Sequence, residues 1–294
     1  IMEKTLLIVS RSRGIDIDLE RIPMDDSKAF ELLQKGETTG VFQLESGGMR
    51  RYLKDLIPTR FEDIIAMVAL YRPGPMEWIP SYIKGKHHPE SVHYLDKSFE
   101  GILNETYGVA VYQEQILQIA QQFAGYTLGE ADILRKAVGK KIASLLAEQR
   151  EKFVQGAVAK GHGQKLAVEV FEQVIEPFAG YGFNKAHAAC YAMIAYQTAY
   201  LKGNFPDEFM TALLMCDQGD MDRIAIEIEE CESMGIQVLP PSINESDVDF
   251  TLVEPGKIRF GLSAVKGVGT APIGEILAIR KQFGPFSSVQ NFSE

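Results

Sequence analysis

The fold of this 294-residue chain is most constrained by glycines that separate segments of helical periodicity. Apolar residues recur at helical spacing over residues 27–35 and 113–124, and each segment is followed by glycine, Gly36 and Gly125. Glycine is common directly after a helix because it adopts left-handed backbone without steric cost. The longest purely apolar run, residues 188–196, has nine residues. It is too short to cross a membrane, so no membrane association is expected.

The same periodicity predicts helices through most of the chain and strands in a few short stretches. A capping box of Thr127 and Glu130 marks the start of one helix, and Gly139 its expected end. Further helices are expected at residues 45–56, 60–70, 145–160, 164–176, 184–203, 207–215, 220–234 and 271–282. Strands are expected at residues 108–112 and, after Gly235, within residues 236–262. The predicted fold is mainly α: a multi-helix domain followed by a small α+β segment.

Charge is distributed unevenly along the chain, whose formal net charge is −10. Residues 207–254 contain thirteen Asp and Glu and a single base, Arg223, so this segment carries −12 and the remainder +2. Residues 130–165 contain eight Lys and Arg against four acids. A polyanion responds to the local field, so the negative total does not exclude nucleic-acid binding. The acidic segment is typical of a solvated face or, alternatively, of a protein-interaction surface.

Residues 134–141 (LRKAVGKK) concentrate positive charge at the end of a predicted helix. Two of the bases lie in the last turn, where cations complement the helix dipole without any ligand. The other two lie beyond the predicted end, which the dipole does not explain. The group also suits a di- or triphosphate, with the arginine as a bidentate donor. The four bases are Arg135, Lys136, Lys140 and Lys141.

Residues 180–191 (GYGFNKAHAACY) place a polar stripe on an otherwise apolar helix. Asn184 is a candidate N-cap, and it shares one helical face with His187 and Tyr191. Lys185 lies in the first turn, where its charge opposes the helix dipole, and a bound anion would relieve that conflict. A nucleotide site and a buried histidine with a solvated lysine both fit this pattern.

Residues 262–277 (LSAVKGVGTAPIGEIL) resemble a helix-hairpin-helix element. Gly267 and Gly269, next to Lys266, would let backbone N–H groups approach a DNA phosphate. A plain turn between helices is the alternative. The pairs Asp16/Asp18 and Asp247/Asp249 could in principle hold a divalent metal, but such pairs are common in turns. The histidines at 87, 88 and 93 lie in a polar loop and no cysteine joins them, which disfavours a zinc site. We therefore expect no metal ligand in this chain.

Six segments, in the same order along the chain, are similar to one family. They are TTGVFQLES (38–46), ALYRPGPM (69–76), TYGVAVYQEQILQIA (106–120), AGYTLGEADILRKAVGKK (124–141), FAGYGFNKAHAACYAMIAYQTAYLK (178–202) and GIQVLPPSINES (235–246). The chain thus resembles the bacterial replicative DNA polymerase III alpha subunits, the C family of DNA polymerases. One departure is Lys136, at a position where the family usually has Arg.

The resemblance implies a division of the chain and a partner for each part. Residues 1–24 would be the end of the palm and its connection to the fingers, residues 25–234 the helical fingers domain, and residues 235–294 short strands with the helix-hairpin-helix element. The implied partners are dNTP, primer-template DNA, and the palm, PHP and thumb domains of a longer chain. The sliding clamp and other replisome subunits would bind through regions outside this chain.

The resemblance also implies candidate contacts for nucleotide and DNA. Arg135 is the first choice for binding the triphosphate. Lys185 and His187 form a second cluster. The full nucleotide-binding set is Arg135, Lys136, Lys140, Lys141, Lys185, His187, Tyr191, Asn184 and Arg72. The DNA-binding set is Arg50, Arg51, Lys54, Lys266, Gly267 and Gly269.

No catalytic residue is expected in the chain. The palm aspartates that hold Mg²⁺ in the family would lie before residue 1, so we expect a fragment that is inactive alone and part of a cytoplasmic polymerase. Two other functions remain open: a non-enzymatic DNA-binding module that uses the hairpin, and an acidic protein-interaction scaffold.

Overall fold

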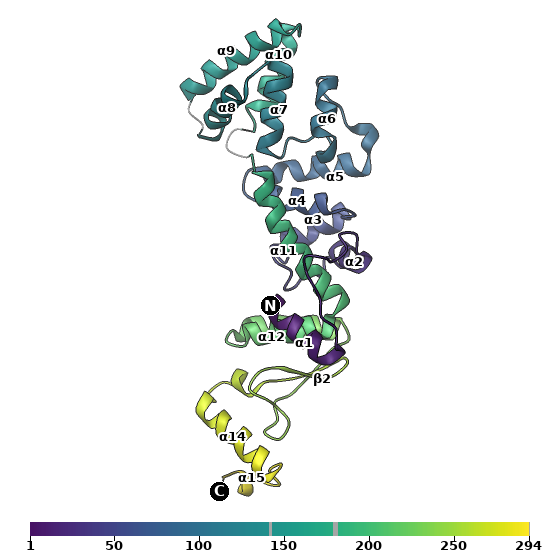
Figure 1. Ribbon diagram of the computed structural model, residues 1–294, viewed down its shortest axis with the longest axis vertical. Coiled ribbons are helices and arrows are strands. Elements are labelled where there is room, and N and C mark those ends of the chain that lie inside the picture. Colours follow the sequence, from purple (N-terminus) through teal and green to yellow (C-terminus); the bar gives the residue numbers. More distant parts are fainter. Residues whose placement is uncertain (141–142, 179–181, 294) are drawn as a thin grey trace. The chain divides into compact units, whose positions relative to one another are not determined.

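The computed structural model of the chain describes residues 1–140, 143–178 and 182–293, except for the side chains of residues 138–143. The described chain is mainly helical with one small sheet, as the sequence predicts (Figure 1). It divides into two compact units. Unit 1 comprises Ile1–Leu32, Glu37–Glu45 and Gln197–Glu294, and unit 2 comprises Leu33–Gly36 and Ser46–Tyr196. Two helices, α2 (Ser27–Lys35) and α11 (Lys185–Asn204), contribute residues to both.

Unit 2 consists of α-helices joined by short 3₁₀ turns and one π-helical turn. Its elements are α3 (Gly47–Leu56), α4 (Phe61–Leu70), η1 (Pro75–Trp78), α5 (Ile79–His87), η2 (Pro89–Ser91), η3 (Lys97–Phe99), α6 (Glu100–Leu103), η4 (Asn104–Thr106), α7 (Gln113–Ala124), α8 (Leu128–Lys140), α9 (Ala143–Ala159), α10 (Gln164–Val170) and the π-helix η5 (Phe171–Ile175).

The core of unit 2 forms where α7, α8 and α9 pack together (Figure 1). Phe153 lies at its centre, with ring centroids 5.9 Å from Phe123 and 5.6 Å from Phe171. All three rings are fully buried. Gly156 allows α9 to approach the end of α7, since a Cβ there would lie 2.2 Å from the carbonyl oxygen of Ala124. This packing buries the apolar faces that the sequence periodicity predicts.

A buried carboxylate joins α4 to α5. Asp63 is fully buried, and its side chain accepts hydrogen bonds from the Lys86 ammonium at 2.5 Å and the Tyr82 hydroxyl at 3.2 Å. The Thr59 N–H donates to the same carboxylate at 3.0 Å. Removing one partner of a buried ion pair leaves an uncompensated charge, so this network fixes the two helices relative to each other.

Two sequence predictions in unit 2 are wrong in detail. Residues 108–112 form no strand, because Gly108 adopts a positive φ of 82° and α7 already begins at Gln113; among the described residues only Tyr112 makes a β-bridge, with Phe183. Gly139 does not end its helix, since α8 continues to Lys140. The helix start is confirmed, because the Glu130 N–H donates to Thr127 Oγ1 while Glu130 Oε2 accepts from the Thr127 N–H at 2.8 Å.

Unit 1 combines helices with a three-stranded sheet of order β1-β3-β2. β1 pairs with β3 in parallel and β2 pairs with β3 in antiparallel orientation. Phe209, Leu213, Phe250 and Ile258 are buried in its core. The elements are α1 (Met2–Arg13), α12 (Pro206–Asp217), α13 (Met221–Ser233), β1 (Gln237–Leu239), β2 (Thr251–Glu254), β3 (Lys257–Arg259), η6 (Leu262–Ala264), α14 (Thr270–Phe283) and α15 (Val289–Ser293).

Much of the acid in residues 207–254 is paired inside unit 1. Arg223 contacts three carboxylates, those of Glu45 at 2.6 Å, Glu227 at 2.9 Å and Asp217 at 3.2 Å. Glu227 is fully buried, and its burial, together with the nearby Asp217, raises its pKa to about 8. The fully buried Lys202 pairs with Glu230. Within the described residues, no helix has both the length and the apolarity to cross a membrane.

We expect Glu227→Gln to stabilise the protein above pH 8. The folded side chain keeps its proton up to about pH 8, while the unfolded one loses it near pH 4.5. The folded state therefore binds more protons between these values, and the stability that this group contributes decreases as the pH rises through that window. Thermal melts of parent and variant at pH 6 and pH 9 test this. Equal gains in Tm at both values would contradict a protonated Glu227.

Candidate nucleotide and DNA interface

The N-terminus of α11 is held against the start of α7 by backbone pairing. The Phe183 N–H donates to the Val111 carbonyl at 3.3 Å, and the Gln113 N–H donates to the Phe183 carbonyl at 3.0 Å. The Gln113 side chain adds a bond to the Gly182 carbonyl at 3.0 Å. These bonds place the first turn of α11 beside the first turn of α7.

Asn184 caps α11, as the sequence predicts. Its Oδ1 accepts a hydrogen bond from the His187 N–H at 2.8 Å. The carboxylate of Glu114, in the first turn of α7, lies at the same helix end. It accepts from Asn184 Nδ2 at 3.0 Å and from the Lys185 N–H at 3.2 Å. The anion that this helix start favours is thus supplied by the protein.

The ammonium of Lys185 has a carboxylate partner of its own. Its Nζ lies 2.7 Å from Glu105 and 5.5 Å from the ring centroid of Tyr112. Both members of the ion pair are about one-third exposed, at 39% and 32%. An exposed pair of this kind is worth little stability and exchanges partners readily. The pair with Glu105 therefore holds Lys185 only weakly.

Aromatic rings line the same end of α11. The His187 ring lies between Phe183 and Tyr191, with centroid separations of 5.4 Å and 4.5 Å. The guanidinium of Arg72 stacks over the Phe183 ring at 4.5 Å, and its Nε donates to the Ala69 carbonyl at 3.0 Å. Burial lowers the pKa of Arg72 from its ordinary value. The structure thus brings together five of the predicted nucleotide-binding residues: Arg72, Asn184, Lys185, His187 and Tyr191.

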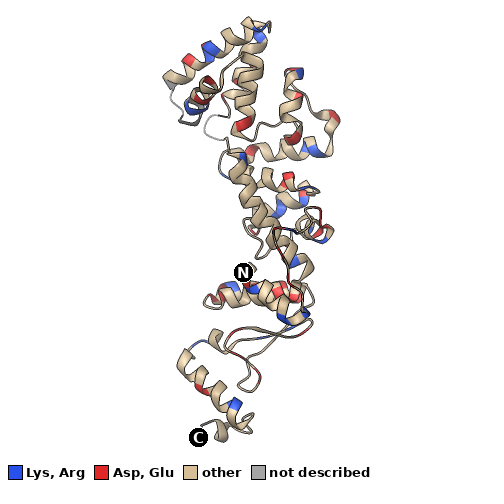
Figure 2. Cartoon of the chain, viewed as in Figure 1, with Lys and Arg blue, Asp and Glu red and all other residues tan. Residues whose placement is uncertain are grey.

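The cations of α8 share one carboxylate on their own helix. Asp132 accepts from Arg135 Nη2 at 2.7 Å and from Lys136 Nζ at 2.7 Å, and these two cations lower its pKa. Figure 2 shows blue and red positions together on α8. In the described part of the chain, no hydrogen bond or ion pair joins Arg135 or Lys136 to α11. Lys141 and the side chain of Lys140 lie outside the described residues.

The bases of α3 are the predicted DNA contacts in unit 2. Arg51 and Lys54 are exposed and Arg50 is half-buried. The Arg51 guanidinium lies 5.5 Å from the centroid of the Tyr52 ring. α3 begins at a Ser46 cap, whose Oγ accepts from the Met49 N–H at 3.3 Å. The three bases thus lie on one short, capped helix.

The predicted hairpin lies in unit 1 between η6 and α14. Gly267 adopts the left-handed region with φ 87°, and a turn closes from the Val268 N–H to the Val265 carbonyl at 3.1 Å. Lys266, Gly267 and Gly269 are all exposed. α14 starts directly after Gly269, so the unpaired N–H groups of its first turn lie next to the exposed turn.

The described residues contain no candidate metal cluster, and part of the acidic segment is paired with bases. In residues 1–140, 143–178 and 182–293, no three His, Cys, Asp or Glu residues come close enough to hold a metal ion. Several acids of residues 207–254 are paired with bases, which weakens their case as an interaction surface. The paired acids are Glu208, Asp217, Glu227, Glu230, Glu245 and Glu254.

Comparison with known proteins identifies the family. The family model described as bacterial DNA polymerase III alpha subunit finger domain matches residues 1–161, and a helix-hairpin-helix motif model matches residues 235–294. The chain therefore belongs to the bacterial DNA polymerase III alpha subunit finger domain family, which confirms the resemblance drawn from its motifs.

Similar curated proteins carry the same name. DNA polymerase III subunit alpha of Thermus aquaticus is 51% identical over 296 residues, which is 99% of this chain and 24% of that protein. The proteins of that name from Chlamydia trachomatis serovar D and Bacillus subtilis strain 168 are 49% and 46% identical, over 97% and 99% of this chain and 23% and 26% of theirs. The chain thus spans about a quarter of the length of these relatives.

Sequence reasoning missed the carboxylates that hold the candidate cations. Asp132 lies three and four residues before Arg135 and Lys136, a spacing that predicts helical ion pairs. The position of Glu114 in the first turn of a helix indicates only a favourable interaction with the helix dipole and does not predict its contact with α11. Glu105 and Lys185 are 80 positions apart, and no sequence pattern predicted that they would pair.

We expect Asn184→Ala to loosen the first turn of α11, because it removes the acceptor for the His187 N–H and a donor to Glu114. Loss of an N-cap costs about 1 kcal/mol. Amide hydrogen exchange over residues 185–188 should therefore accelerate. Asn184→Ser, which keeps a capping oxygen, is the control, and unchanged exchange in Asn184→Ala would contradict the cap.

Proposed function

We propose that this chain is the nucleotide- and DNA-contacting fingers region of a DNA-directed DNA polymerase. The observation that carries the proposal is the N-terminal turn of α11, where Asn184, Lys185 and His187 meet Arg72 and Tyr191 in a member of a polymerase finger family. The Lys185 ammonium and the His187 ring suit the oxygens of a triphosphate, and the neighbouring aromatic rings suit the base or sugar of a dNTP.

Phosphoryl transfer requires mainly positioning and charge stabilisation. Lys185 and His187 would bind triphosphate oxygens, and Lys185 would exchange Glu105 for phosphate. Arg135 and Lys136 would do the same in exchange for Asp132. Lys140 and Lys141 belong to this proposal by sequence alone. The Mg²⁺ ions of the reaction would be held by palm residues outside this chain.

DNA binding would use two further surfaces. The α3 bases Arg50, Arg51 and Lys54 would contact duplex phosphates. The hairpin would present Lys266 and the N–H groups near Gly267 and Gly269 to a backbone phosphate, without reading sequence. The match of residues 235–294 to a helix-hairpin-helix motif supports this assignment.

The remaining assignments follow from the same proposal. Residues 1–24, 25–234 and 235–294 would be the end of the palm, the fingers, and the strand and hairpin segment. The palm, PHP and thumb domains, the sliding clamp and other replisome subunits would be partners of the whole protein, which would act in the cytoplasm. The chain alone would lack polymerase activity.

We expect Lys185→Ala and Arg135→Ala each to weaken dNTP binding by about tenfold, because each removes a charge-assisted hydrogen bond. Isothermal titration with dNTP and Mg²⁺ measures this. Lys165→Ala is the matched control, since Lys165 is an exposed lysine of unit 2 that has no ion pair among the described residues. Variants that bind like the parent would remove these residues from the site.

Glu105→Gln should have the opposite effect. The amide keeps the shape of the side chain but no longer competes with phosphate for the Lys185 ammonium. Its dNTP affinity should therefore exceed that of the parent, and the gain should vanish in the Glu105→Gln/Lys185→Ala double variant. A gain that survives in the double variant would contradict competition at Lys185.

Gly267→Val should weaken primer-template binding and leave dNTP binding unchanged, because it strains backbone at φ 87° in unit 1. Fluorescence anisotropy over a salt series measures the affinity and the number of phosphate contacts. A loss of DNA binding in Gly267→Val with none in the α3 variants Arg51→Ala and Lys54→Ala would favour a module that binds DNA by the hairpin alone.

A further inference from the structure

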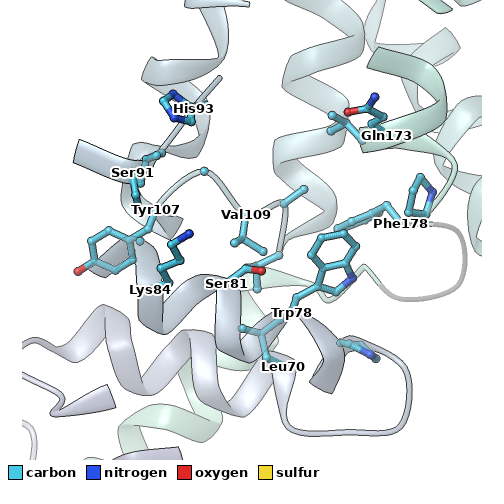
Figure 3. A pocket seen from close by; sticks show the side chains of 18 residues that line it. Leu70, Trp78, Ser81, Lys84, Ser91, His93, Tyr107, Val109, Gln173 and Phe178 are labelled. Atoms are coloured by element: carbon cyan, nitrogen blue, oxygen red, sulfur yellow. The ribbon is translucent and has the colours of Figure 1, made fainter. Parts of the chain in front are cut away.

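Unit 2 also contains a cavity, and none of the residues proposed to bind nucleotide at α11 lines it. Its wall includes Val111, whose carbonyl accepts the hydrogen bond from the Phe183 N–H. The cavity has a volume of about 300 Å³ and lies between α5, the segment 107–111 and the end of η5 (Figure 3). In Figure 3, Lys84, Ser91, Tyr107 and His93 lie on the left, and Trp78, Gln173 and Phe178 on the right. This volume is at the lower end of the range for small-ligand sites.

Two departures from regular backbone lie in the wall of this cavity, and a third directly precedes a lining residue, Pro75. Gly74, with φ 99° and ψ −78°, precedes the 3₁₀ turn that carries Trp78. Tyr107 adopts φ 52°, which is uncommon for a non-glycine residue. The π-helix η5 carries Gln173, which lines the cavity. Positive φ values at non-glycine residues and π-helical turns both concentrate at functional sites.

Two polar side chains of the lining, Lys84 and Trp78, can only donate hydrogen bonds, whereas those of Ser81, Ser91, His93, Tyr107 and Gln173 can donate and accept. The side chains of Lys84, Trp78 and His93 have no hydrogen bond or ion pair to the described residues. None of the residues that line the cavity is Asp or Glu, although the chain has 40 acids and a net charge of −10. An unpaired ammonium and an indole N–H without a carboxylate favour a ligand that carries negative charge and acceptors.

The remainder of the lining is apolar. Val109, Val111 and Phe178 are buried, and Leu70 and Val174 complete this part of the wall. Trp78 is half-buried, so one part of its indole is free to meet a ligand. An indole beside aliphatic side chains is a stacking surface for a planar ring, and every nucleobase has such a face.

We propose that this cavity binds one nucleotide unit, with its base against Trp78 and its phosphate near Lys84 and His93. The nucleotide comes either from a single strand of DNA or from solution as a mononucleotide, because both present the same base and phosphate. The assignment is distinct from the triphosphate site proposed at α11, since no residue proposed to bind the triphosphate lines this cavity.

Trp78 is the single tryptophan of the chain, so its fluorescence reports on this cavity alone. The 294-residue chain is excited at 295 nm and titrated separately with oligo(dT), dAMP and inorganic phosphate. N-acetyltryptophanamide corrects for absorption by the nucleotides. We expect saturable quenching by oligo(dT), dAMP or both, and none by inorganic phosphate. Quenching by one nucleic-acid ligand alone identifies the source.

Two variants connect the signal to the lining. Lys84→Ala should weaken binding of whichever nucleotide quenches the fluorescence by about tenfold, because it removes the ammonium that faces the phosphate. Ser81→Phe fills the cavity and should abolish quenching while Lys84 remains. Both side chains are exposed, and circular dichroism verifies that each variant is folded. Lys165→Ala is the control and should bind like the parent.

The outcomes separate this proposal from the proposed function. Quenching that persists in Lys185→Ala and Arg135→Ala but fails in Lys84→Ala supports the cavity whether or not dNTP binds at α11. No quenching by any nucleotide, equal quenching by inorganic phosphate, or equal affinity in Lys84→Ala and the parent would overturn it.

Discussion

The candidate site depends on the hydrogen bonds that the Glu114 carboxylate accepts from the start of α11. This carboxylate accepts from the Asn184 side chain and the Lys185 N–H, and it lies in the first turn of α7. With the backbone pairing of Phe183, it fixes the direction in which α11 leaves the turn. The ring of His187 and the ammonium of Lys185 take their positions from that direction. A helix start that the protein itself neutralises needs no ligand to be stable.

The candidate cations are held by carboxylates in the free chain. Lys185 pairs with Glu105, and Arg135 and Lys136 pair with Asp132. All these pairs are partly exposed, so their exchange for phosphate costs little. Such pairing restricts these long side chains before an anion binds, which lowers the entropy lost on binding. The proposed fingers region therefore combines prearranged cations with carboxylates that a polyanion must displace.

Local sequence signals predicted much of the fold and part of the site. The capping box at Thr127, the Asn184 cap and the strands after Gly235 are encoded within a few residues, and all are present. Contacts between distant segments had no such signal: Glu114 and Asn184 are 70 positions apart. The expected strand at 108–112 is wrong because Gly108 has a positive φ and α7 begins directly after Tyr112. The expected helix end at Gly139 is wrong because α8 continues to Lys140.

Hydrogen-exchange mapping of the chain with primer-template DNA, dNTP and Mg²⁺ tests the central claim most directly. Binding at the proposed interface slows exchange of backbone amides in the elements that contact the ligands. The account predicts that adding dNTP to the DNA complex protects residues 183–191 at the start of α11 and residues 132–138 of α8. Protection confined to residues 262–283 around the hairpin, with no change at α11 or α8, would contradict it.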